Sequence, residues 1–184
     1  MTTIFIALAP VLIILFYVYF RDKYEKEPIG LLLKALLAGA IITIPIYFIE
    51  VGLSSFGASV MDGSSQIIWS AFVVAAGTEE VFKFIALFIL IWANRNFNER
   101  FDGIVYAVFV SLGFALVENL LYVIQGGIEV GWLRAITAVP GHALFGVTMG
   151  YYLGLARFCS GGERTGFIVR ALFWPIILHG FYDY

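Results

Sequence analysis

Six long apolar stretches restrict the fold of this chain more than any other feature of its sequence. A helix needs about 20 apolar residues to cross the hydrocarbon core of a bilayer, and it satisfies its own backbone hydrogen bonds there. The stretches are Thr3–Phe20, Ile29–Val51, Ile67–Trp92, Gly103–Ile124, Leu133–Phe158 and Gly166–Tyr184. We therefore predict an all-α fold, a polytopic bundle of about six transmembrane helices in a lipid bilayer.

The composition agrees with a lipid environment. The chain is 61% hydrophobic and 13% charged, whereas soluble domains carry about 25% charged residues. A net charge of −2 and the absence of a basic run argue against nucleic acid as a partner. The lone cysteine, Cys159, excludes an internal disulfide. No linker or convincing internal repeat divides residues 1–184, which predicts one integral-membrane domain.

The basic residues of the connecting segments predict how the chain is oriented. Lys and Arg occur in segments 20–28 and 93–102 and around 159–165, whereas segments 52–66 and 126–132 contain neither. Connecting segments rich in Lys and Arg stay on the cytoplasmic side. The strict alternation therefore predicts a multi-pass protein of the cell membrane with both termini outside.

Glycines at four-residue intervals mark the fifth predicted helix. Gly146, Gly150 and Gly154 lie one turn apart, so they share one face. In a bilayer, small residues spaced in this way allow two helices to approach closely. The pattern predicts tight packing of this helix against a neighbour.

Charged side chains inside the third predicted helix point to function, because charges in spanning segments cost free energy unless they are paired or hydrated. The segment 77–83 (GTEEVFK) places two carboxylates and an ammonium near the middle of this helix. Lys83 lies four residues after Glu79 and three after Glu80, so it can reach either. One ion pair accounts for one glutamate, which leaves the second available as a general acid or base.

The remaining buried ionisable groups come from other helices. They are Glu118 in the fourth predicted helix, His142 in the fifth, and His179 in the sixth, with Asp183 one turn after His179. Counted from the outer helix boundaries, the depths are roughly 18 Å for Glu79, 14 Å for His142, 10 Å for Glu118 and 8 Å for His179. All four lie in the outer half of the membrane, which predicts one shared polar site open to water from outside.

Two histidines and one glutamate form a known ligand set for catalytic zinc, with the fourth position left for water. The sequence predicts His142, His179 and Glu118 as ligands, and Glu79 or Glu80 as the base that accepts the proton of the water.

Two neighbours of this ligand set have supporting roles. Asp183 would orient His179, and Lys83 would keep one glutamate ionised or stabilise an oxyanion. A mechanism without metal stays open, in which a glutamate activates water directly and a histidine stabilises the oxyanion.

Several motifs, in the same order along the chain, resemble those of the PrsW-type membrane proteases, which are distantly similar to the CAAX-processing and bacteriocin-processing membrane proteases. The resemblance covers roughly Tyr24 to Asp183. The matching elements are Glu79-Glu80-x-x-Lys83 (EExxK), Phe114-x-x-x-Glu118-Asn119 (FxxxEN), His142, His179 with Asp183, and the loop Tyr24–Pro28.

The resemblance implies an intramembrane peptidase with catalytic paired glutamates, in which Asn119 supports the neighbouring Glu118. It also implies a role in regulated intramembrane proteolysis, as the first cleavage of a membrane-anchored regulator such as an anti-sigma factor, on its outer side. The related CAAX-processing proteases have histidine where this chain has Glu118. The resemblance therefore leaves open whether Glu118 binds a metal.

Two other classes of protein also fit part of the pattern. A proton- or ion-coupled transporter buries carboxylates and histidines in the same way, but the chain has no visible inverted repeat. A membrane scaffold or chaperone would not need Glu80 or His142 for its function. The number of motifs in order favours the protease.

Overall fold

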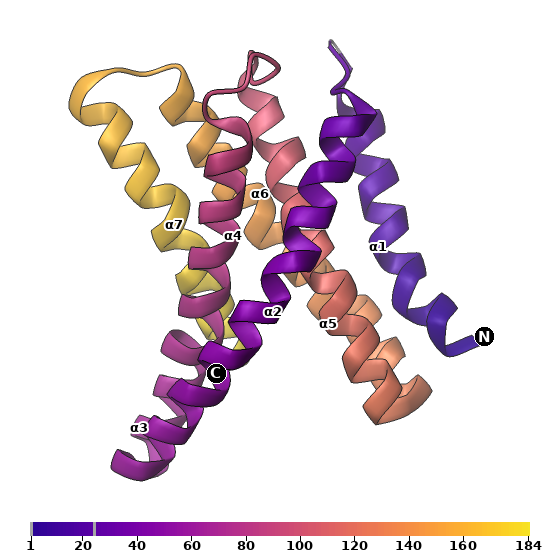
Figure 1. Cartoon of the computed structure of the whole chain (residues 1–184), viewed down its shortest axis with the longest axis vertical. Helices are drawn as coiled ribbons and strands as arrows, with labels where there is room; N and C mark the ends of the chain where they lie inside the picture. Colours follow the sequence, from indigo (N-terminus) through magenta and orange to yellow (C-terminus); the bar gives the residue numbers. More distant parts are fainter. Residues whose placement is uncertain (1, 24) are drawn as a thin grey trace.

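The computed structural model, which describes residues 2–23 and 25–184, is an all-α bundle (Figure 1). Tyr24, the first residue of the loop Tyr24–Pro28 that carries part of the resemblance, lies outside the described residues. The elements are α1 (Thr2–Arg21), α2 (Ile29–Val60), α3 (Gly63–Ile68), the π-helical stretch η1 (Trp69–Ala75), α4 (Ala76–Ile91), α5 (Arg100–Ile136), α6 (Ala138–Arg157) and α7 (Gly161–Asp183).

Four segments are long and apolar enough to cross a membrane, namely Ile4–Arg21, Ile29–Val60, Arg100–Arg157 and Gly161–Asp183. The third of these combines α5 and α6, which form a hairpin with extensive contacts between its two helices. The elements α3, η1 and α4 follow one another without a break. The predicted all-α membrane bundle is therefore confirmed, and helices lie at all six predicted positions.

The two connecting segments without Lys or Arg are shorter than predicted, because helices extend into both of them. Segment 52–66 was expected to be a loop, but α2 continues to Val60 and α3 begins at Gly63. Segment 126–132 is helical on both sides of Gly127, whose φ of 78° and ψ of −167° break α5. Only glycine adopts such a backbone conformation readily. The fifth predicted helix therefore begins at Ala138 rather than Leu133, because residues 128–136 form the redirected end of α5.

The connecting segments fall at two ends of the bundle. The α1–α2, α4–α5 and α6–α7 connections, which carry the basic residues, lie at the upper end of Figure 1. The α2–α3 and α5–α6 connections lie at the lower end, where α1 also starts. The helix directions therefore alternate as the basic residues predict.

The glycine face of α6 packs directly on the backbone of α5. A Cβ atom added to Gly150 would collide with the carbonyl oxygen of Gly103, and one added to Gly154 with that of Arg100. A Cβ on Gly146 would come within 3.0 Å of Ser111 Cβ. The predicted close packing is therefore confirmed, and it makes the α5–α6 hairpin a tight platform for the side chains that it carries.

Buried acidic side chains join the α1–α2 connection to the start of α5. Asp22, Glu27 and Asp102 are all buried, and the Tyr106 hydroxyl donates a hydrogen bond to Glu27 Oε2. Burial raises the pKa of the Glu27 carboxyl to about 8; Tyr106 opposes this rise, whereas the nearby charges of Asp102 and Asp22 add to it. Glu27 is therefore held in its neutral form around neutral pH.

The raised pKa of Glu27 makes the stability of the fold depend on pH. Because the folded chain holds this proton up to about pH 8 and the unfolded chain releases it near pH 4.5, the contribution of Glu27 to stability is fully present below pH 4.5 and is lost as the pH rises through 8. We expect thermal unfolding in detergent to show a Tm that falls over this range by a few degrees. The fall should be smaller in Glu27→Gln. The matched exposed variant Glu163→Gln should behave as wild type; an equal fall in Glu27→Gln would contradict the assignment.

Candidate active site

The charged part of α4 follows directly on the π-helical stretch η1. At their junction the Ala76 backbone N–H donates to the carbonyl of Ala71, five residues earlier. A π-helical turn holds one extra residue and often occurs at functional sites. The turn sets the register of α4, whose side chains Glu79, Glu80 and Lys83 are only 5%, 0% and 1% exposed.

Lys83 pairs with both glutamates. Its Nζ donates to Glu79 Oε2 at 2.9 Å and to Glu80 Oε1 at 2.8 Å, and it lies 4.3 Å from the centre of the Phe114 ring. The sequence argument gave Lys83 one glutamate as a partner, whereas the structure places its ammonium between the two. The three side chains together carry one net negative charge when all are ionised.

The hydrogen bonds of His142 fix its tautomer. Lys83 Nζ lies 3.2 Å from His142 Nδ1, and Glu118 Oε2 lies 2.9 Å from His142 Nε2. Because an ammonium only donates, Nδ1 accepts, so the proton is on Nε2 and is donated to Glu118. The lone pair of His142 Nδ1 therefore faces the Lys83 ammonium, which also pairs with the two glutamates.

His179 lies between two carboxylates. Its Nδ1 is 3.0 Å from Glu80 Oε1 and 3.9 Å from Glu79 Oε2, and its Nε2 is 3.2 Å from Asp183 Oδ2. The ring also stacks on Phe145, with centroids 4.7 Å apart. Ionised carboxylates only accept, so both ring nitrogens donate and the ring is an imidazolium when its partners are ionised. The contact with Asp183 that the sequence predicted is present.

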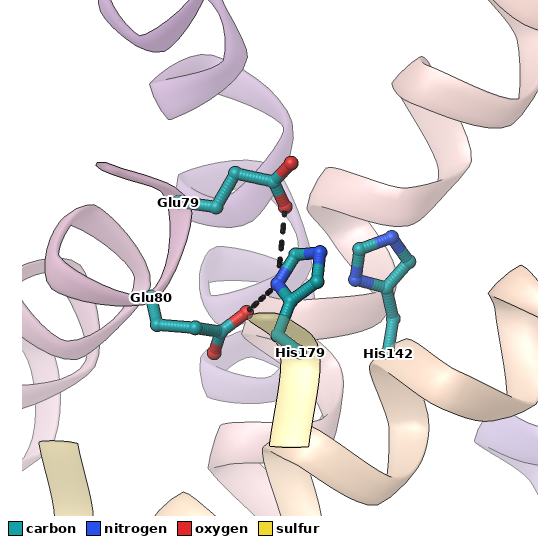
Figure 2. Close-up of side chains that lie close together, drawn as sticks. All are labelled: Glu79, Glu80, His142 and His179. Carbon is teal, nitrogen blue, oxygen red and sulfur yellow. Dashed lines mark hydrogen bonds and ion pairs between the residues drawn. The ribbon is translucent and has the colours of Figure 1, made fainter. Parts of the chain in front are cut away.

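Four of these side chains form a group that fits a divalent metal. Figure 2 shows the carboxylates of Glu79 and Glu80 beside the rings of His142 and His179, and one ligand atom from each lies within 4.8 Å of the others. Glu80 Oε2 is buried and has no hydrogen-bond partner among the described residues. Imidazoles and carboxylates are the ligand types that zinc uses in catalytic sites. The positively charged ammonium of Lys83 lies among these ligand atoms and contacts Glu79, Glu80 and His142.

Glu118 lies outside this group, on the far side of the His142 ring. Its Oε2 accepts from Arg134 at 2.7 Å as well as contacting His142. Arg134 Nε also donates to Asn119 Oδ1 at 3.1 Å, and Asn119 Nδ2 donates to the Ala7 carbonyl at 2.9 Å. Glu118, Asn119 and Arg134 thus form a hydrogen-bonded network, which contacts His142 through its Nε2 atom.

A cavity of about 840 Å³ opens beside the group and is lined by residues of α2, α3, η1, α4, α5, α6 and α7. Glu79 lines this cavity, whereas Glu80 does not. The other polar lining residues include Glu50, Glu118, Arg134, His142, His179 and Asp183. Water that enters this cavity can therefore reach Glu79 and both histidines.

The sequence analysis missed two lining residues, Glu50 and Arg134. Glu50 lies in the apolar run 46–53 of the second predicted helix. A charged residue inside such a run was sufficient reason to predict it as a site residue. Arg134 is a basic residue near the outer end of a predicted spanning helix, and its contact with Glu118 depends on the break at Gly127. The pair Gly126-Gly127 was the available signal for that break.

Comparison with known proteins shows the family to which this chain belongs. Residues 27–184 match the family described as "PrsW family intramembrane metalloprotease". The chain is 40% identical to Protease PrsW of Oceanobacillus iheyensis over 177 residues, which are 96% of this chain and 79% of that protein. It is 39% identical to Protease PrsW of Bacillus subtilis over 177 residues, with the same shares, and 36% identical to Protease PrsW of Clostridioides difficile over 184 residues, or 97% and 76%. No solved structure matches this one. The chain belongs to the PrsW family of intramembrane metalloproteases, as the resemblance of its motifs implied.

Proposed function

We propose that this protein hydrolyses a peptide bond of a membrane-anchored regulatory protein, such as an anti-sigma factor, near the outer side of the membrane. The observation that carries the proposal is the meeting of Glu79, Glu80, His142 and His179 in one buried group beside a cavity of an apolar bundle. Unpaired, these groups would destabilise a membrane protein, and together they have the chemistry of a hydrolytic site.

His142, His179 and Glu80 are the residues that we assign to a divalent metal, with zinc as the candidate. A metal held there would supply Lewis acidity that activates water and polarises the scissile carbonyl. Each histidine then offers Nδ1, because its Nε2 is engaged by Glu118 or Asp183. We therefore assign Glu118, a ligand in the sequence analysis, to holding the tautomer of His142. Such supporting carboxylates orient ligating histidines and raise their basicity.

Glu79 is the residue that we assign as the general base. Its carboxylate lines the cavity, so it is placed to take a proton from water, whereas Glu80 is fully buried behind it. The same proton can then go to the leaving amine of the peptide, as microscopic reversibility of acid–base catalysis allows. Lys83 holds both carboxylates in place through its two ion pairs. The Lys83 ammonium also contacts His142 Nδ1. A metal bound to His142 and Glu80 would therefore have to displace the ammonium from at least some of these contacts.

The orientation is part of the proposal. With the basic connections on the cytoplasmic side, both termini lie outside, and the cavity opens towards the outer half of the bilayer. The scissile bond of the substrate then lies near its outer membrane boundary, where a spanning helix can unwind at a lower cost than in the hydrocarbon core.

Reconstitution of the purified full-length protein in proteoliposomes tests this function against ion-coupled transport. We expect cleavage of a co-reconstituted membrane-anchored anti-sigma factor at its outer boundary, by wild type but not by Glu79→Gln, and no proton flux that depends on Glu79. A Glu79-dependent proton flux without cleavage of the substrate would contradict the proposal and favour a transporter.

A further inference from the structure

Glu50 differs from the other carboxylates of the cavity in having no partner. Glu79 pairs with Lys83 at 2.9 Å, Glu118 with Arg134 at 2.7 Å, and Asp183 with His179 at 3.2 Å. Within residues 2–23 and 25–184, Glu50 makes no comparable hydrogen bond or ion pair, although it lines the same cavity. The cations of the site are therefore already engaged by other acids.

The position of Glu50 on α2 directs it into the cavity. Glu50 follows Ile46 by four residues and Tyr47 by three, and Ser54 follows Glu50 by four; all line the cavity together with Thr43, so they share one face of the helix. Phe48, on another face, is 69% exposed on the outside of the bundle. The carboxylate thus faces the space that a substrate would enter and not the lipid.

A lone carboxylate in an apolar segment costs free energy unless a cation or donor joins it. The cavity is also lined by Tyr47, which lies one turn before Glu50 on α2, and by Tyr122, whose ring already lies 4.1 Å from the Arg134 guanidinium. Such aromatic walls suit the aliphatic stem of a long basic side chain, and aromatic faces attract its cationic head. A lysine or arginine of a bound peptide would meet both features at once.

We propose that Glu50 is a specificity-determining residue that binds a lysine or arginine side chain of the peptide substrate, close to the scissile bond. The inference rests on the proposed function of the cavity as the place of peptide hydrolysis. It adds a preference for substrates with a basic residue at one defined position. Glu118 and Asp183 do not provide this preference, because their charges are already paired within the site.

Cleavage of a substrate series by the full-length protein in proteoliposomes tests the inference. In a membrane-anchored substrate, Lys, Gln or Glu is placed at successive positions on both sides of the cut, and kcat/KM is measured for each. At one position we expect wild type to cleave the Lys substrate about tenfold faster than the Gln substrate, as a charged hydrogen bond would give. Glu50→Gln should lose this preference, and Glu50→Lys should prefer Glu at the same position.

The matched control is Glu129→Gln, because Glu129 is exposed on α5 and does not line the cavity. It should keep the wild-type preference for Lys. Equal cleavage of the Lys, Gln and Glu substrates by wild type at every position would overturn the role of Glu50, and so would a Lys preference that persists in Glu50→Gln. A wild-type protein that cleaves no substrate in the series would instead count against the proposed function itself, and the inference would fall with it.

Discussion

Glu79→Gln should lower kcat for peptide hydrolysis by about 10³-fold, within the range that a general base contributes. Glutamine keeps the shape of the side chain and an oxygen that can accept from Lys83, but it cannot take a proton from water. Glu79 lines the cavity, so its loss removes the proton acceptor nearest to the substrate. The measurement is single-turnover cleavage of a membrane-anchored substrate by the purified variant.

Two comparisons make the assignment of Glu79 specific. Metal content should stay near the wild-type level in Glu79→Gln but fall in Glu80→Gln, because Glu80 is the proposed ligand. Glu163→Gln, an exposed change at the start of α7, should alter neither activity nor metal content. A Glu79→Gln variant with near wild-type kcat would show that another group accepts the proton.

His142→Ala and His179→Ala should each weaken zinc binding by more than 100-fold and reduce cleavage in parallel. Each change removes one of three proposed ligands, which is more damaging than loss of a supporting carboxylate. Glu118→Gln and Asp183→Asn keep the ligands but weaken their orientation, so a smaller loss of about 10–100-fold is expected. Competition with a chelator of known affinity measures all four variants.

The order of these losses distinguishes ligands from supporting residues. If Glu118→Gln lost as much zinc affinity as His142→Ala, Glu118 would be a ligand, as the sequence alone predicted. If both histidine variants kept full zinc content, the ligand set proposed from the geometry would be wrong.

The helices were predictable because their apolar runs are long, but the ends of α2 and α5 were not. The segments around Asp62 and Gly127 are rich in glycine or serine, which is typical of loops. In the structure α2 reaches Val60 and α5 reaches Ile136, because helix ends depend on packing against neighbours more than on local propensity.

Most of the site was predictable because ionisable groups stand out in apolar segments. Glu79, Glu80, Lys83 and both histidines were found in this way, and they meet in space. The glutamate that faces the cavity could not be predicted, because the extra residue per turn in η1 changes the register of α4.

The contact between Arg134 and Glu118 could not be predicted from the sequence for a different reason. It depends on the direction that residues 128–136 take after the positive φ of Gly127. A change of direction at one residue is not visible in hydropathy, although it decides which helix end covers the site.

Zinc titration of the metal-stripped full-length protein, with bound metal and cleavage followed in the same sample, is the most direct test that a metal held by His142, His179 and Glu80 supports hydrolysis. We expect cleavage to be absent without metal, to rise with bound zinc, and to level off at about one zinc per chain. His179→Ala should show neither binding nor cleavage over the same range. Full cleavage by the metal-stripped protein would contradict the metal site and leave Glu79 to activate water without it.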